Sequence, residues 1–352
     1  MLAPAVASAA AGRPPARALA RALATSMGSP RSVSSGWAMA VHVYVSEGRD
    51  KQLVSRFSAA GVSGGAVLAN EFMDAAYHRS GITLAAASAG PLEAGVLAVA
   101  SEALSALDLQ SHSATHPRVG VVDHVACNPL GSATRADAGA LAARLGQLLG
   151  AGAAEVPAAG VAGPSPARPP LPVYLYGAAR ADERPLAELR RALGYFGGAA
   201  RGEWTGLSSK MARAMAELPP DHGPATPSAR SGAAVVGAVP WVFNYNLLLS
   251  AASAGGVGDD GELMRRARRV ARAVSARGGG LAAVESMALP HERGVEVACN
   301  LLDVATTSPA EVRALVEALS KPEGLAIDSD YFTNKHPEDV LALVLTGSEK
   351  VA

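Results

Sequence analysis

The sequence predicts an α+β fold made of two tandem ferredoxin-like (βαββαβ) subdomains that form a groove. Three observations lead to this prediction. Apolar runs typical of strands are interleaved with segments that have the 3.6-residue spacing of helices. These segments follow the order strand, helix, strand, strand, helix, strand, and that order occurs twice along the 352 residues. With 49% apolar residues, a chain of this length can bury a core in each half.

The first half opens with the β-branched and aromatic run VHVYVS, which has the composition of a strand. Pro91 suits the first turn of its second helix. The elements predicted here are, in order, a strand at 41–46, a helix at 50–59, strands at 65–70 and 81–87, a helix from 91, a strand at 119–126, a helix at 135–149, a strand at 172–177 and a helix at 185–193.

The second half repeats the order. Its last helix is well marked, because Ser308 can cap it, Pro309 suits its first turn and Glu311 completes a capping box. The elements predicted here are, in order, a strand across 234–249, a helix at 262–277, strands near 281–288 and 295–301, and a closing helix and strand.

The first forty residues differ from the rest of the chain. Arginines are scattered among alanine and serine, and no acidic residue precedes Glu47. This composition is typical of a transit peptide, so we expect residues 1–40 to be a transit peptide or a disordered leader. Import would place the protein in a chloroplast or mitochondrion, and without import it would be cytoplasmic. The two subdomains are then expected at 41–231 and 232–350.

Charge and cysteine content argue against several classes of protein. Lys plus Arg and Asp plus Glu number 31 each, so no net field attracts nucleic acid or an anionic membrane. Cys127 and Cys299 lie far apart and form no CxxC pair, which argues against a disulfide framework or a zinc site. The apolar stretch 232–251 contains Pro240 and Asn244, which favour buried strands over a membrane span. We therefore expect no metal, no nucleic acid and no membrane.

The stretch SHSATHPRVGVVDH at 111–124 gathers three histidines around one His-Pro step. Pro117 disfavours helical geometry at His116, so His112 and His116 are not expected to share a helix face as paired metal ligands do. The stretch lies between a predicted helix and a predicted strand, where a loop can hold His116 for proton transfer near neutral pH. A histidine that only satisfies backbone groups of the turn is an equal alternative.

Other polar groups are weaker candidates. Arg79 in DAAYHRS could grip a carboxylate with two nitrogens, and the loop PPDHGPATP at 219–227 has the composition of a shaped binding loop. Asn244 and Asn246 place amides on a predicted strand, where they could face a cleft or satisfy edge backbone groups. The arginine-rich helix at 262–277 could attract an anionic tail or nucleic acid, but its apolar stripe favours a plain solvated face. For each of the others, an ordinary structural role is the competing interpretation.

Six short motifs follow one another from about Val41 to near the C-terminus. Together THPRVGVVDH, VYLYG, GEW, DHGP, NYN and NLLD resemble the formiminotransferase domain of the formiminotransferase-cyclodeaminase family, particularly its branch in photosynthetic eukaryotes. The resemblance implies two ferredoxin-like subdomains around a groove for tetrahydrofolate. It also implies transfer of a formimino group between N-formiminoglutamate and N5 of the pterin. The implied fold agrees with the tandem units predicted from the pattern.

The resemblance implies roles for individual residues. His116, the histidine before Pro-Arg, matches the family's catalytic histidine and would act as general acid and base. Tyr44 stands where the family has the asparagine of a Pro-Asn-Phe-Ser-Glu-Gly pattern, so the one-carbon donor can differ. The residues expected to contact substrate or folate, several of them in the loop that matches the family's folate-contacting loop, are Arg79, Arg118, Asp123, Asp221, His222, Gly223, Pro224, Ala225, Thr226, Asn244 and Asn246.

We therefore expect a transferase of one-carbon groups, with tetrahydrofolate as co-substrate and an N-formiminoglutamate-like donor of a formimino or formyl group. Its expected partners are small molecules, namely the folate and the amino-acid donor or acceptor, and a homodimer is left open. The alternative is a non-catalytic folate-binding or interaction protein built on the same fold, because a fold alone does not guarantee chemistry.

Overall fold

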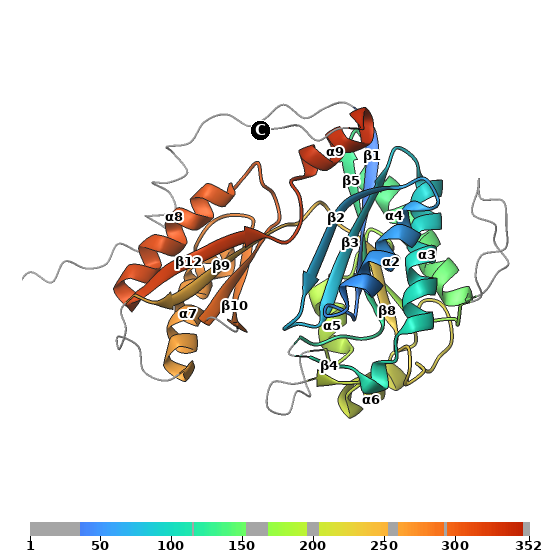
Figure 1. The fold of residues 1–352 in the computed structure, drawn as a ribbon, viewed down its shortest axis with the longest axis horizontal. Coiled ribbons are helices and arrows are strands. Elements are labelled where there is room, and N and C mark those ends of the chain that lie inside the picture. The colour runs from blue at the N-terminus through green and yellow to red at the C-terminus, as the bar shows by residue number, and fades with distance from the viewer. Residues whose placement is uncertain are drawn as a thin grey trace, which may run out of the picture. The chain divides into compact units, whose positions relative to one another are not determined.

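The computed structural model describes residues 36–114, 116–152, 168–195, 204–252, 260–291 and 294–347. These residues form two compact units, each of which has its own sheet (Figure 1). The N-terminal unit holds the described residues up to Phe243 and those from Phe332 onward. The C-terminal unit holds the described residues of Asn244–Tyr331.

The N-terminal unit is built on a six-stranded sheet with the order β2-β3-β1-β5-β8-β6. Strands β5, β8 and β6 are parallel to one another, and the remaining pairs are antiparallel. Its elements are β1 (Trp37–Val45), α2 (Lys51–Val62), β2 (Val67–Asp74), β3 (Arg79–Ala86), α3 (Ala89–Ala106), η1 (Leu109–Ser111), β4 (Ser113–Ala114), β5 (Val122–Gly131), α4 (Arg135–Ala151), β6 (Val173–Gly177), α5 (Leu186–Ala192), β7 (Trp204–Thr205), α6 (Ser209–Glu217), β8 (Ala234–Ala238) and α9 (Pro337–Thr346).

Alternation along β1 sends its side chains to two faces. Val41, Val43 and Val45 are fully buried in the core that β1 forms with α2 and α3, and each stabilises the fold by about 1.5–3 kcal/mol. Figure 1 shows α2, α3 and α4 along this side of the sheet. His42 and Tyr44 alternate with the valines, so they point to the opposite face. That opposite face carries the polar cluster described below.

The C-terminal unit is a four-stranded sheet with the order β10-β11-β9-β12. In both units the strands of the βαββαβ set are arranged second, third, first, fourth, which is the ferredoxin-like order. The predicted α+β fold with tandem ferredoxin-like subdomains is therefore confirmed. The elements of this unit are β9 (Phe243–Ala251), α7 (Asp260–Val274), η2 (Ala276–Gly278), β10 (Val284–His291), β11 (Gly294–Leu301), α8 (Pro309–Ser320), η3 (Lys321–Glu323) and β12 (Leu325–Phe332).

The predicted capping box of the last helix of the second repeat is confirmed. The Ser308 hydroxyl accepts from Glu311 N, the Glu311 carboxylate accepts from Ser308 N, and Pro309 occupies the first turn. Such caps satisfy backbone N–H groups that have no partner inside the helix, and each contributes about 1 kcal/mol.

The predicted strand at 234–249 is two strands. Pro240 falls between β8 and β9, and β8 pairs in parallel with β5 and β6 of the first sheet. The expected boundary between 231 and 232 is therefore wrong, because it would cut β8 from its partners. Along the chain, the boundary between the two units lies instead between Phe243 and Asn244. Helix α9 was not expected, and it packs against β1, β2, β3 and β5 of the N-terminal unit.

The leader was expected to extend to residue 40, but the first strand starts before that position. Trp37 to Ala40 belong to β1 and pair with β5, so the fold begins before residue 41. Residues 1–35 lie outside the described residues. Among the described residues, no helix combines the length and the apolarity needed to cross a membrane.

We predict that a chain starting at Gly36 folds normally, whereas one starting at Val41 is strongly destabilised. The shorter chain lacks Ala38, Met39 and Ala40, all buried, together with their ladder hydrogen bonds. Deleting a buried methionine side chain alone costs about 2–5 kcal/mol of unfolding free energy. Urea denaturation of the two chains measures the difference, and equal midpoints would show that the strand does not need these residues.

Candidate functional site

A polar cluster lies on the face of the first sheet opposite α2 and α3. Tyr44 of β1 and His124 of β5 are directly opposite in register, and their rings stack with centroids 5.4 Å apart and planes 6° apart. His124 Nε2 lies 2.7 Å from the Tyr176 hydroxyl of β6. The Tyr176 ring reaches across β8 because Gly237 has no side chain, since a Cβ there would lie 2.4 Å from the ring.

An ion pair joins two strands at the edge of this aromatic surface. Arg79 begins β3, and its Nη2 lies 3.1 Å from Asp123 Oδ2 at the start of β5. The Asp123 side chain is only 1% exposed, and its Oδ1 accepts from Val119 N at 2.6 Å. The Arg79 guanidinium also lies 4.4 Å from the centre of the Tyr44 ring. Arg79 is thus held by a carboxylate and by a cation–π contact.

His116 lies beside this ion pair, in the loop before β5. Its Nδ1 is 2.7 Å from the Pro117 carbonyl oxygen, which can only accept, so Nδ1 carries the proton. Nε2 is then the basic nitrogen, and Arg79 Nη1 lies against the ring, 3.3 Å from Nδ1 and 3.4 Å from Nε2. Burial lowers the pKa of His116 well below its usual value, and the charges of Arg79 and Arg190 lower it further. His116 is therefore neutral at physiological pH.

Arg118 holds the His116 loop through hydrogen-bond contacts with its backbone and with His112. Its Nη2 donates to the His116 carbonyl oxygen, and its Nη1 lies 2.9 Å from His112 Nε2. Burial lowers the pKa of Arg118 to about 10, so it remains charged at neutral pH. His112 stacks on His78 with centroids 4.0 Å apart, and His78 Nε2 lies 3.2 Å from Glu47 Oε1. A continuous chain of polar contacts thus runs from Glu47 to His116.

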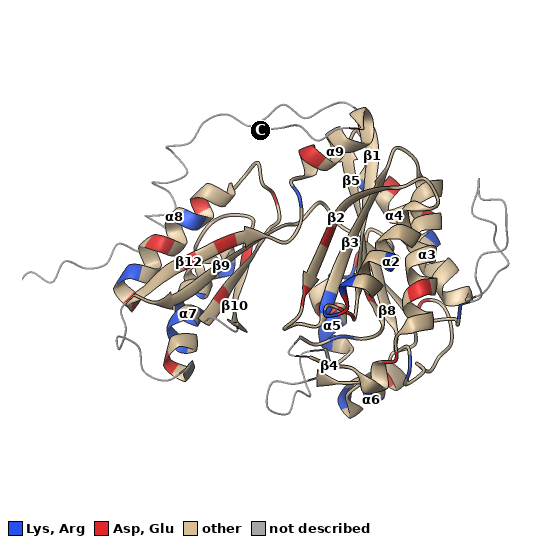
Figure 2. Cartoon of the chain, in the orientation of Figure 1, with Lys and Arg blue, Asp and Glu red and all other residues tan. Residues whose placement is uncertain are grey.

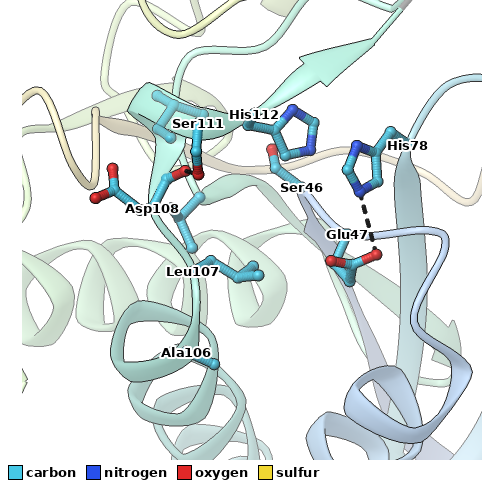
Figure 3. Close-up of a pocket in the computed structure, with 10 residues that line it drawn as sticks. Ser46, Glu47, His78, Ala106, Leu107, Asp108, Ser111 and His112 are labelled. Carbon is cyan, nitrogen blue, oxygen red and sulfur yellow. Dashed lines mark hydrogen bonds and ion pairs between the residues drawn. The ribbon is translucent and has the colours of Figure 1, made fainter.

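A pocket of about 200 Å³ opens beside Glu47 and His78 (Figure 3). In Figure 3 the rings of His78 and His112 face one another, and Glu47 meets His78 from below. An engineered cavity of about 150 Å³ accepts benzene, so the pocket has room for part of a small ligand. The residues that line it are Ser46, Glu47, His78, Ala106, Leu107, Asp108, Leu109, Ser111, His112 and Val121.

The structure thus brings four of the predicted site residues together: His116, Arg79, Arg118 and Asp123. The predicted bidentate grip of Arg79 on a ligand carboxylate does not match its contacts, because one terminal nitrogen pairs with Asp123 and the other contacts His116. Arg118 is likewise engaged inside the protein by His112 and the His116 carbonyl. Both arginines therefore position the loop and its histidine.

The predicted folate-contacting loop lies at the edge of β6. Asp221 Oδ2 accepts from Leu175 N at 2.7 Å, and Oδ1 pairs with Arg180. His222 exchanges backbone hydrogen bonds with Val173. Pro224 is half-buried, whereas Gly223, Ala225 and Thr226 are exposed. The loop is therefore anchored through Asp221 and His222, and its contact with folate stays a prediction.

Asn244 and Asn246 belong to β9 of the C-terminal unit, where side chains of β11 accept hydrogen bonds from their amides. Asn244 Nδ2 donates to Asn300 Oδ1 at 2.7 Å. Asn246 is buried, and its Nδ2 donates to Glu296 Oε1 at 2.8 Å. Both partners are side chains, so these contacts differ from the edge backbone groups of the alternative interpretation, and a role of the two amides in ligand binding stays a prediction.

Sequence reasoning missed Glu47, His78 and Arg190. His78 lies in DAAYHRS and Glu47 follows the first strand, but neither was assigned a role. They meet because the chain brings the end of β1 close to the start of β3. Arg190 of α5 lies 4.6 Å from the centre of the Tyr195 ring and lowers the pKa of His116. Among the described residues, no group of three or more His, Cys, Asp or Glu side chains is arranged to hold a metal ion.

Comparison with known proteins identifies the family. Residues 38–239 match the model for the formiminotransferase domain, N-terminal subdomain. A formiminotransferase cyclodeaminase-like protein of Arabidopsis thaliana is 36% identical over 310 residues, which cover 85% of this chain and 93% of that protein. A glutamate formimidoyltransferase of Thermoplasma acidophilum is 27% identical over 267 residues, which cover 74% of this chain and 76% of that protein. The chain belongs to the formiminotransferase family.

We predict that acid destabilises the N-terminal unit steeply below pH 6.5. Burial lowers the pKa of His42 to about 4 and of His112 to about 3, and it lowers the pKa of His116 and His124 well below their usual value. Because each folded pKa lies below the unfolded value of about 6.5, stability is complete above that pH. Below pH 6.5, each of these histidines lowers the free energy of unfolding by up to about 1.4 kcal/mol for every unit by which the pH falls.

Urea denaturation at pH 7.5, 6 and 5 measures this slope. The variant His42→Asn serves as the comparison, because it removes one of the four groups while leaving the His116 cluster intact. Its stability should fall less steeply with acid than that of the unchanged protein. A stability that stays flat down to pH 5 would contradict the assignment of these histidines as neutral.

Proposed function

We propose that this protein transfers a formimino or formyl group between an N-formiminoglutamate-like donor and tetrahydrofolate, the co-substrate of its family, with His116 as general acid and base. Family membership supports the reaction class, and the relative named glutamate formimidoyltransferase supports the donor. The observation that carries the residue assignment is the His116 imidazole. It is neutral, its Nδ1 is fixed on the Pro117 carbonyl, and its Nε2 is the basic nitrogen.

The reaction needs one group that accepts and then returns a proton. N5 of the pterin attacks the amidine carbon, and His116 Nε2 takes the N5 proton as the new N–C bond forms. The tetrahedral intermediate then collapses, the bond between carbon and the donor nitrogen breaks, and His116 returns the proton to that departing nitrogen. A histidine that starts neutral can perform the first step at physiological pH. Glutamate and 5-formimino-tetrahydrofolate are the products.

Arg79 has a positioning and electrostatic role in this scheme. Its positive charge beside the imidazole ring disfavours the imidazolium, so the proton that His116 accepts is held weakly and is passed on readily. Asp123 keeps Arg79 in place, and Arg118 fixes the loop backbone at the His116 carbonyl. Orientation of this kind supplies much of the acceleration in group transfer.

We propose that folate contacts come from the loop of Asp221–Thr226, as the family resemblance implies. The exposed backbone around Gly223 and Thr226 supports this assignment, because exposed loop groups can reach a ligand. Tyr44 underlies Arg79 where the family has asparagine, so we propose that the donor side of the site is the part that differs.

The second candidate is a non-catalytic folate-binding protein. The observation that favours it is that Arg79 and Arg118 are both engaged internally, which leaves neither as a ready grip for a donor carboxylate. The two candidates are separated by product analysis. Purified protein is incubated with formiminoglutamate plus tetrahydrofolate, or with 5-formyl-tetrahydrofolate plus glutamate. Folate binding without product in either mixture would favour the second candidate.

We predict that His116→Ala lowers turnover by about 100- to 10,000-fold while the affinity for folate stays nearly unchanged, because a general acid-base acts mainly on the transition state. Turnover is measured beside calorimetric affinity for tetrahydrofolate. His291→Ala, in β10 of the C-terminal unit, is the matched control and should retain turnover. Loss of affinity and turnover together would make His116 a ligand-positioning residue, and full turnover would exclude it as the catalytic group.

We also propose that the basic, acid-free leader directs import into a chloroplast or mitochondrion. Because β1 begins at Trp37, we predict that processing removes residues before that position and leaves the strand intact. Mass spectrometry of the N-terminus of the native protein measures the site. An intact Met1 on protein from the cytosolic fraction would overturn the proposal.

A further inference from the structure

The arginines of α7 and η2 fall into two groups. Arg265 and Arg266 both bond Glu262, at 2.7 Å and 2.8 Å, and Arg269 bonds Glu323 at 2.7 Å. These three are ordinary surface ion pairs. The second group consists of Arg268 and Arg272 of α7 and Arg277 of η2.

Arg268 and Arg272 are both exposed. Neither makes an ion pair or a side-chain hydrogen bond with any described residue. They are four residues apart on α7, so they project from the same face, one turn above the other. Arg277 of η2 has only a distant partner, Glu285, at 3.7 Å. In Figure 2 the blue segments of α7 mark the arginine-rich helix.

All three of these arginines line one pocket of about 420 Å³ between α7, η2 and β10. We call it the arginine pocket. Its wall also includes Met287, which is 54% exposed although it is large and apolar. The residues that line it are Arg268, Ala271, Arg272, Ser275, Arg277, Gly278, Ser286, Met287 and Ala288.

Like charges one turn apart on a helix repel each other, so this arrangement is unfavourable without a counter-charge. Arg272 lies in the last turn of α7, where the helix dipole favours a cation, but that accounts for one of the three charges. Guanidinium groups present paired N–H donors that match the oxygens of carboxylate and phosphate groups. A ligand with several such oxygens would satisfy Arg268, Arg272 and Arg277 together.

We infer that the arginine pocket of the C-terminal unit binds a small, multiply charged anion of the oligophosphate or polycarboxylate class. The exposed Met287 offers an apolar contact to the body of such a ligand. The inference does not rest on the proposed function, because it involves no residue of the His116 cluster.

Calorimetry on the full-length protein in 50 mM NaCl tests the inference, with inorganic pyrophosphate as one probe and citrate as the other. The pocket variant is Arg268→Gln/Arg272→Gln. The control variant is Arg213→Gln/Arg265→Gln, which removes the same charge from two arginines that have carboxylate partners. Circular dichroism and thermal unfolding establish that both variants fold.

We expect binding of at least one probe with a dissociation constant below 1 mM, at least tenfold weaker in the pocket variant and within threefold of the original in the control. Tighter binding of pyrophosphate identifies phosphate as the preferred group, and tighter binding of citrate identifies carboxylate. Failure of both probes to bind the unchanged protein overturns the inference. Equal weakening in the two variants also overturns it, because it would reduce the effect to net charge.

Discussion

The arrangement of the candidate site depends on the buried ion pair between Arg79 and Asp123. This pair joins the first residue of β3 to the second residue of β5, two strands that are both neighbours of β1. Through its other oxygen Asp123 holds Val119 N, and through its other nitrogen Arg79 contacts the His116 ring. Buried ion pairs contribute little net stability compared with apolar replacements of similar volume. We therefore interpret the main role of this pair as positioning. It holds the loop that carries His116 and places the Arg79 guanidinium beside the His116 ring.

Electrostatics and packing act together on the histidines of this sheet. Taking His124 and His116 out of water disfavours their charged forms, and the nearby arginines reinforce that effect. The same burial is possible because Gly81 and Gly237 make room for the rings of Tyr44 and Tyr176. Small residues on one strand thus allow aromatic rings on the next to cover the histidines. The low pKa of His116 and His124 therefore depends on the packing of the sheet, including its glycines, as well as on the loop before β5.

The sequence predicted the two βαββαβ sets because strand alternation, helix spacing and the capping box at Ser308 are local signals. It did not separate β8 from β9, since both flank Pro240 in one apolar run, and the parallel pairing of β8 depends on residues more than a hundred positions earlier. Pro117 and the family motif marked His116. The contact of Arg79 with Asp123 joins positions 44 residues apart, and no local pattern encodes it. Because the ion pair with Asp123 could not be predicted, Arg79 was expected to be available to bind a ligand carboxylate.

The return of the chain from the C-terminal unit has a consequence for synthesis on the ribosome. Helix α9 packs on β1, β2, β3 and β5, yet it follows the whole of Asn244–Tyr331 in the chain. The chain leaves and re-enters the N-terminal unit at neighbouring points, where the rings of Phe243 and Phe332 stack at 4.7 Å. A nascent polypeptide that has emerged as far as β8 therefore has its six strands but lacks the helix that packs on four of them. The first unit to begin folding is also the last to be completed, after the intervening unit has been made.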